Sequence, residues 1–182
     1  MTVDHIPSYI VDSKIECMAS EIVKLTGGQH PLCLIGVMKG GLWTMYRLLA
    51  ALGLYHCGQD VIIGHIGFSS YNQMMHSQEM RCTYSLDLSP DDMRGRHVWV
   101  IDDIYDTGAT IEAALASINK LKPNECLLNV ATLVTKQPSR PEVHGFVVNK
   151  NQFVVGCGMG IGELQRSQPF ITTVPTTHRE ID

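Results

Sequence analysis

The sequence predicts an α/β protein with a mostly parallel, twisted sheet flanked by helices. Two stretches support this prediction, because each reads as a buried strand, a polar turn and an amphipathic helix. The apolar runs at 32–38 and 98–101 lack the alternation of a half-exposed strand, as is typical of parallel strands covered on both faces. Apolar residues at helical spacing follow these runs over 42–52 and 111–121.

A further helix is expected before the first strand. Apolar residues recur at helical spacing from Ile15 to Leu25, so this segment should pack one face on the core. Asp12 or Ser13 is the expected N-cap, and Gly27-Gly28 should end the helix.

The other elements follow from apolar runs and turn residues. Residues 61–68 and 81–88 read as two strands joined by a polar loop, and 89–97 reads as a turn. Another buried strand is expected at 125–136, and short strands are expected at 146–148 and 153–156.

Composition and charge exclude several classes of protein. The 182 residues suit one domain, and 45% hydrophobic with 18% charged residues is ordinary for a globular chain. A formal net charge of −4 argues against a nucleic-acid partner, and no apolar run is long enough to cross a membrane. The six cysteines are scattered and no secretory signal is visible, so we expect a reduced, cytoplasmic protein.

The turn after the second buried strand has the chemistry of an anion site. Thr107 to Thr110 lie where the first amides of a helix are unpaired, and those amides suit a phosphate. Asp102 and Asp103 add acceptors for sugar hydroxyls or for a magnesium ion. On spacing alone another interpretation stays open, in which the two aspartates are solvated at a strand end and Asp106 caps the helix.

Two other glycine-containing segments bear on phosphate binding. Lys39-Gly40-Gly41 follows the first strand, where backbone amides can converge and the ammonium adds charge, although a plain surface turn has the same sequence. It is not a nucleoside-triphosphatase loop, because Leu42 follows Gly41 where that motif needs lysine. The glycine-rich run at 156–162 likewise fails the dinucleotide fingerprint in either register.

The segment VIDDIYDTGAT, residues 100–110, resembles the signature of the type I phosphoribosyltransferases. The resemblance extends over roughly residues 32–171 and is nearest to the hypoxanthine-guanine branch of that family. It implies a single domain over 1–182, with a core at about 30–136 and a small hood from about 137–182 plus the N-terminal segment. The implied reaction transfers the phosphoribosyl group of phosphoribosyl pyrophosphate to hypoxanthine or guanine and releases pyrophosphate.

The resemblance also implies a role for individual residues. Asp106 matches the general base, or electrostatic partner, at the purine ring nitrogen. The other matches are the 5′-phosphate residues Thr107, Gly108, Ala109 and Thr110, the ribose and magnesium ligands Asp102 and Asp103, the pyrophosphate residues Lys39, Gly40 and Arg166, the purine residues Lys136, Phe153 and Val154, and the closing loop at Ser70 and Tyr71. Magnesium is the expected cofactor, and a homodimer or homotetramer is the expected assembly.

Some positions depart from the family or allow a second interpretation. Gly160 stands where the family has an aspartate that assists a second magnesium. The Met38-Lys39 peptide, in contrast, matches a peptide that is often cis in the family. Without the resemblance, Lys136 would be a solvated lysine and Phe153 a core residue. Xanthine or another heterocycle stays open as the base, as does a regulator on the same fold that senses nucleotides and binds RNA.

Overall fold

The computed structural model describes residues 4–28, 30–55, 60–70, 80–121 and 126–174. Its elements, in chain order, are β1 (His5–Ile6), α1 (Ser8–Leu25), β2 (Leu32–Met38), α2 (Gly41–Tyr55), β3 (Val61–Ser70), β4 (Met80–Tyr84), α3 (Pro90–Met93), β5 (His97–Tyr105), α4 (Ala109–Lys120), β6 (Leu127–Thr135), β7 (Val143–Val147), β8 (Phe153–Val155) and β9 (Ile171–Val174). Among the described residues, no helix is long and apolar enough to cross a membrane.

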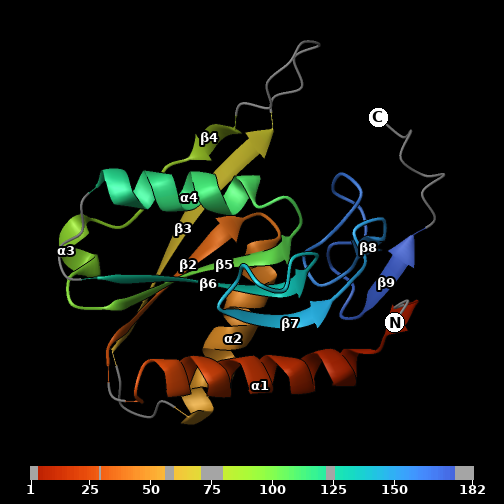
Figure 1. Cartoon of the computed structure of the whole chain (residues 1–182), viewed down its shortest axis with the longest axis horizontal. Coiled ribbons are helices and arrows are strands. Elements are labelled where there is room, and N and C mark those ends of the chain that lie inside the picture. The colour runs from red at the N-terminus through yellow and green to blue at the C-terminus, as the bar shows by residue number, and fades with distance from the viewer. Residues whose placement is uncertain (1–3, 29, 56–59, 71–79, 122–125, 175–182) are drawn as a thin grey trace.

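A six-stranded sheet in the order β4-β3-β2-β5-β6-β7 forms the centre of the protein (Figure 1). Its neighbouring strands are parallel except at one edge, where β4 runs antiparallel to β3. The predicted class, a mostly parallel α/β sheet flanked by helices, is therefore confirmed.

Helices cover both faces of this sheet and create two apolar cores. Side chains alternate between the faces of a strand, so Leu34 and Trp99 pack with α1 and α2, while Ile35 and Val100 pack with α3 and α4. Burial on both faces explains why β2 and β5 are continuous apolar runs in the sequence.

After β2 and after β5 the chain continues toward opposite edges of the sheet. From β2 it passes through α2 to β3, and from β5 it passes through α4 to β6 on the other side. The two strands are direct neighbours, with Ile35 opposite Val100. In such a sheet the crevice outside the carboxyl ends of the two diverging strands is where ligands bind.

A second, three-stranded sheet in the order β1-β9-β8 joins segments from near the two ends of the chain. Its strand pairs are antiparallel, with His5 opposite Thr172 and Phe153 opposite Val174. In Figure 1 this sheet lies beyond the carboxyl ends of the central parallel strands, and it brings Phe153 across from the turn after β5.

Three details of the secondary structure correct the sequence-based expectations. The helix expected to begin near Asp12 begins at Ser8, after Pro7 as N-cap, because Val11 already lies on its buried face. Asp12 forms an ion pair with Arg47 of α2 instead. The turn expected at 89–97 contains the short helix α3, which begins with a reciprocal capping box between Ser89 and Asp92.

The strand after the polar loop is also shorter than expected. It spans Met80–Tyr84 rather than 81–88, because residues 85–88 leave the sheet edge and Asp87 bonds to His65 of β3. The pairing of β1 with β9 has no counterpart among the sequence-based predictions.

Candidate active site

The carboxyl end of β2 leads into a turn that packs directly on β5. The Met38–Lys39 peptide is cis without proline, as expected. A Cβ atom at Gly40 would overlap the Asp103 carboxylate, and one at Gly41 would lie 2.8 Å from the Asp102 Cα atom. Both glycines are therefore required by the close approach of this turn to the acidic pair, and Lys39 is held beside that pair.

The acidic pair at the end of β5 is buried. Asp102 and Asp103 are each 7% exposed, which excludes the interpretation that they are merely solvated at a strand end. The Asp103 N–H donates to the Asp102 carboxylate at 2.9 Å. Burial raises the pKa of both carboxyl groups, and the charge of Asp103 raises that of Asp102 further, while the nearby Arg166 lowers both.

The turn after β5 leads into the N-terminus of α4. Gly108 is the N-cap, and its φ of 90° lies in the left-handed region that favours glycine. A Cβ atom there would also collide with the Tyr105 hydroxyl. The Ala109 N–H faces the Thr107 Oγ1 at 3.4 Å, and Asp106 does not cap the helix. The amides of the first turn of α4 therefore border an open cavity beside two threonine hydroxyls.

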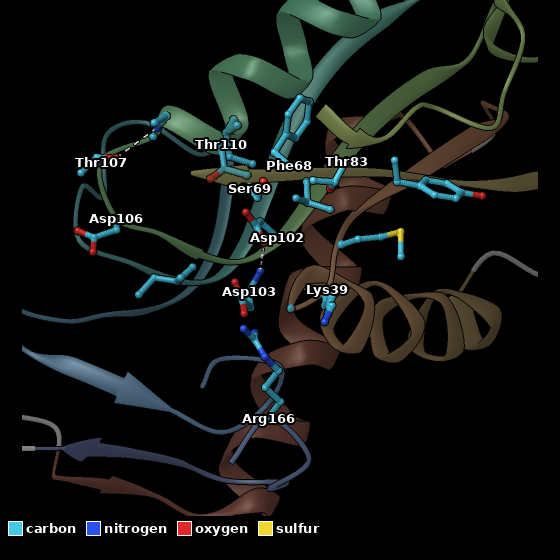
Figure 2. A pocket seen from close by; sticks show the side chains of 18 of the residues that line it. Lys39, Phe68, Ser69, Thr83, Asp102, Asp103, Asp106, Thr107, Thr110 and Arg166 are labelled. Atoms are coloured by element: carbon cyan, nitrogen blue, oxygen red, sulfur yellow. Dashed lines mark hydrogen bonds between the residues drawn. The ribbon is translucent and has the colours of Figure 1, made fainter. Parts of the chain in front are cut away.

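A cavity of about 660 Å³ lies at the carboxyl ends of β2 and β5 (Figure 2). Ten of the predicted site residues line it, from both turns and from the segment after β8: Lys39, Gly40, Asp102, Asp103, Asp106, Thr107, Gly108, Ala109, Thr110 and Arg166. Figure 2 shows the Arg166 side chain reaching from the loop between β8 and β9 toward Asp103, with Thr107 and Thr110 on the opposite side. The cavity thus has cations at one end and a helix N-terminus at the other.

A second, smaller cavity of about 240 Å³ adjoins the first. The two cavities share Asp103, Ile104, Asp106 and Arg166. The smaller one adds the three predicted purine residues, Lys136, Phe153 and Val154, together with Met159 and Gly160. Phe153 is half-buried and faces this cavity, so it is not a core residue.

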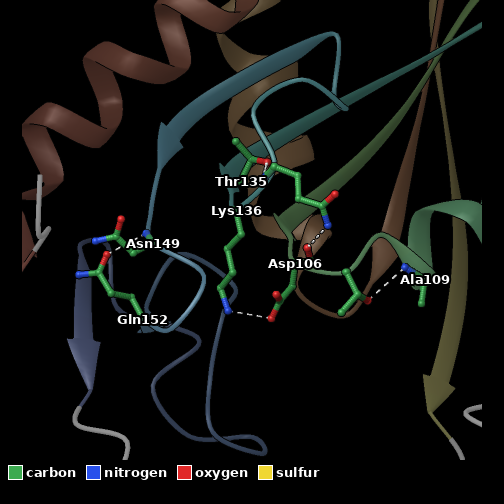
Figure 3. A network of polar contacts seen from close by, with 8 residues as sticks. Asp106, Ala109, Thr135, Lys136, Asn149 and Gln152 are labelled. Atoms are coloured by element: carbon green, nitrogen blue, oxygen red, sulfur yellow. Dashed lines mark hydrogen bonds and ion pairs between the residues drawn. The ribbon is translucent and has the colours of Figure 1, made fainter.

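Asp106 and Lys136 form an ion pair at the boundary of the two cavities. The Lys136 Nζ lies 2.8 Å from the Asp106 Oδ2, and Figure 3 shows the two side chains pointing at each other. The Lys136 side chain is only 4% exposed, which excludes a simple solvated lysine, whereas that of Asp106 is 55% exposed. The Gln137 side-chain amide donates to the Asp106 carbonyl at 2.7 Å and helps fix this turn.

Arg166 is held in place by backbone carbonyls of its own loop. Its Nε and Nη1 atoms donate to the Gly162 and Gly158 carbonyls at 2.9 and 2.7 Å. A Cβ atom at Gly160 would lie 2.7 Å from the Arg166 Cγ and would overlap the Leu164 carbonyl. The loop conformation therefore leaves no room for the aspartate that the family resemblance implied at position 160.

The predicted closing loop is placed only in part. Ser70 ends β3, but its side chain and Tyr71 lie outside the described residues. Its neighbour Ser69 lines the larger cavity, as do Phe68 and Thr83, which the sequence-based prediction missed. The signal for these residues was weak, because 61–68 and 81–88 read simply as two strands joined by a polar loop.

Glu163 is a charged residue of the site that the sequence-based prediction also missed. It lines the larger cavity, and its Oε1 lies 2.7 Å from the Lys39 Nζ. The sequence shows only an acid three residues before Arg166, and nothing in that spacing places it beside Lys39.

Two carboxyl groups of the site are of the kind that can ligate a magnesium ion. In the described parts of the chain, no three His, Cys, Asp or Glu side chains are grouped closely enough to hold a metal ion. Asp102 and Asp103 nevertheless provide two adjacent carboxyl groups. Magnesium is usually held by one or two carboxylates with water and substrate phosphates, so this donor set suits it.

The fold and the site define a phosphoribosyltransferase, and the chain belongs to the family described as the phosphoribosyl transferase domain, which residues 10–160 match. Human phosphoribosyltransferase domain-containing protein 1 is 30% identical over 178 residues, covering 93% of this chain and 76% of that protein. The bovine (Bos taurus) hypoxanthine-guanine phosphoribosyltransferase is 28% identical over 181 residues, covering 94% of this chain and 80% of that enzyme.

Solved structures show the same fold. A hypoxanthine phosphoribosyltransferase from Staphylococcus aureus matches with a TM-score of 0.79 and 23% identity, over 97% of this chain and 92% of the other. A hypoxanthine-guanine phosphoribosyltransferase from Bacillus anthracis matches with a TM-score of 0.77 and 26% identity, over 96% and 99% of the two chains. Family membership and fold, as implied by the signature segment, are therefore confirmed.

Proposed function

We propose that this phosphoribosyltransferase transfers the phosphoribosyl group of phosphoribosyl pyrophosphate to a 6-oxopurine, hypoxanthine or guanine. The products are the nucleoside monophosphate and pyrophosphate. The observation that carries the proposal is the pair of adjoining cavities, one lined by two cations and the N-terminus of α4, and one lined by Phe153 and Lys136. The bovine and Bacillus anthracis relatives, which are both named hypoxanthine-guanine phosphoribosyltransferases, support the choice of base.

The larger cavity takes the phosphorylated sugar in this proposal. Thr107 to Thr110 and the N-terminus of α4 bind the 5′-phosphate, because helix amides and hydroxyls donate to anionic oxygens. Asp102 and Asp103 accept from the ribose hydroxyls. Lys39, Gly40 and Arg166 bind the pyrophosphate at the opposite end.

The smaller cavity takes the purine. Phe153 stacks on the base, a contact worth about 1–3 kcal/mol. The Lys136 ammonium donates to the 6-oxo group, and the backbone of Val154 borders the base edge. A 6-amino group presents donors instead of an acceptor to this ammonium, so adenine is expected to be a poor substrate.

Asp106 lies where the two substrates meet. As the purine nitrogen forms its bond to C1′ of the ribose, the bond from C1′ to the pyrophosphate oxygen breaks and its electron pair leaves with pyrophosphate. The base nitrogen must lose a proton, and the Asp106 carboxylate at the shared edge of the cavities is placed to accept it.

Two further parts of the proposal concern magnesium and water. Asp102 and Asp103 would hold magnesium, which neutralises charge on the departing pyrophosphate when bound. Ser70 and Tyr71 belong to a segment proposed to close over the site, which would keep water from a cation-like sugar.

Turnover with phosphoribosyl pyrophosphate, magnesium and a panel of hypoxanthine, guanine, xanthine and adenine tests the proposal. We expect nucleotide formation with hypoxanthine or guanine at a kcat/KM well above that with xanthine or adenine. A preference for xanthine would assign the enzyme to another base. Salt-dependent retention of RNA without any turnover would instead favour the nucleotide-sensing regulator.

The assembly and the cellular location stay predictions. A homodimer or homotetramer is expected from the resemblance, and light scattering of the purified protein would measure it. Cys17 and Cys82 at the surface are free thiols, which suits the proposed reducing cytoplasm.

A further inference from the structure

The cations proposed to bind pyrophosphate already have an anionic partner within the chain. The Glu163 Oε1 lies 2.7 Å from the Lys39 Nζ, and the Glu163 Oε2 lies 3.8 Å from the Arg166 Nε. All three residues line the larger cavity. The hydrogen bond and charge of Lys39 lower the pKa of Glu163, as does the charge of Arg166, so this carboxylate is charged at neutral pH.

The position of Glu163 follows from the shape of its loop. Arg166 is anchored to the Gly158 and Gly162 carbonyls, and Gly160 has no space for a side chain. The loop therefore presents its first acidic side chain at 163 rather than at 160. There the carboxylate lies against Lys39 rather than beside the acidic pair.

The charge balance of the cavity makes this carboxylate unfavourable for substrate binding. Among the described residues that line the cavity, the cations are Lys39 and Arg166, and Glu163 lies close to both of them. A diphosphate group that contacts both cations must displace Glu163 or bind beside its charge. Both events weaken the binding of the diphosphate.

We infer that Glu163 is an internal competitor of pyrophosphate for Lys39 and Arg166, which weakens diphosphate binding and speeds its release. The inference rests on the proposed function of the cavity. Because the ion pair is exposed, with side chains 63% and 68% accessible, the carboxylate can swing away and return without unfolding the loop. Release of product limits the turnover of many enzymes, so such a competitor favours rapid cycling.

The variant Glu163→Gln tests the inference, because glutamine keeps the shape and can still accept from Lys39 but lacks the charge. Calorimetric titration with magnesium pyrophosphate at low salt should show binding about three- to tenfold tighter than in the unchanged protein. Titration with guanosine monophosphate, whose phosphate is expected at the N-terminus of α4, should change less than twofold.

A matched control is Asp91→Asn, which removes one carboxylate of α3 from another exposed ion pair, that with Arg94. It should leave both titrations unchanged. Pyrophosphate binding that is unaltered or weaker in Glu163→Gln would overturn the inference while leaving the proposed function intact. If the protein without any substitution binds neither pyrophosphate nor the nucleotide, the proposed function is overturned, and the inference with it.

Discussion

The buried ammonium of Lys136 and the exposed carboxylate of Asp106 lie 2.8 Å apart, across the boundary between the two cavities of the site. Lys136 borders only the smaller cavity, which is proposed to bind the purine, whereas Asp106 borders both cavities. Substitution of the two residues should therefore produce different kinetic effects.

The variant Asp106→Asn is expected to lower kcat by at least about 100-fold, because an amide cannot accept the proton of the base. Substrate binding should be largely kept, since asparagine has nearly the same shape and Asp106 is not needed to cap α4. Steady-state turnover and calorimetric binding of the nucleotide measure the two effects. A variant as active as the unchanged enzyme would remove Asp106 from the chemistry.

The variant Lys136→Met should raise the KM for hypoxanthine by about 10-fold or more, because a hydrogen bond from a charged donor contributes roughly 1.5–3 kcal/mol. The affinity for pyrophosphate should stay the same, since Lys136 does not border the larger cavity. Initial rates at varied base concentration and a pyrophosphate titration measure both quantities. An equal loss of affinity for hypoxanthine and for pyrophosphate would show that the substitution disturbs the whole site.

The variant Asp102→Asn is expected to stabilise the fold while lowering activity. The pKa of Asp102 is raised well above its ordinary value of 3.8 by burial and by Asp103, so its charged form is disfavoured in the folded protein. An asparagine can keep the acceptor for the Asp103 N–H without that charge. We expect a higher Tm at pH 8, by a few degrees, since about 1 kcal/mol corresponds to roughly 2–4 °C in a protein of this size.

The sign of the pH dependence follows from the raised pKa of Asp102. The unchanged protein loses stability as pH rises from the unfolded pKa, near 3.8, through the folded value, because ionisation then occurs more readily in the unfolded chain. The gain in Tm of Asp102→Asn should therefore be small at pH 4 and grow toward pH 8. A gain that is constant with pH would contradict this account, and Asp91→Asn on α3 is a surface control.

The variant Gly40→Ala should abolish most activity and lower stability by about 1–3 kcal/mol, because the added Cβ atom overlaps the Asp103 carboxylate. Gly53→Ala in α2 is the matched control, since among the described residues no atom beyond its chain neighbours and the backbone of its own helix lies within 4 Å of a Cβ added there. Alanine at that helical position should be neutral or should stabilise by about 0.5–1 kcal/mol. Urea unfolding and turnover of both variants measure the contrast, and a harmless Gly40→Ala would contradict the close packing described for this turn.

The features that the sequence revealed are local ones. Continuous apolar runs identified β2 and β5, because a strand that is buried on both faces is apolar throughout, whichever elements cover it. The polar residues after each run could be placed in one crevice, because parallel neighbours end at the same edge of a sheet. The family resemblance then supplied roles that spacing alone left open for Lys136 and Phe153.

The features that the sequence did not reveal depend on distant parts of the chain. The pairing of β1 with β9 joins two short strands whose few residues carry no clear period. The contact of Glu163 with Lys39 links residues 124 positions apart through an irregular loop, which no local pattern describes. The start of α1 was missed because Pro7 supplies no capping side chain of the kind that marks a helix in sequence.

The small sheet also has a consequence for how this enzyme is made. Polypeptide that has left the ribosome only as far as Thr135 contains the Lys39 turn and residues 102–110 but lacks Arg166, which lines both cavities. Phe153 obtains its neighbouring strand only when residues 171–174 have been synthesised. Neither cavity can therefore be complete before the segment that carries Arg166 has been synthesised.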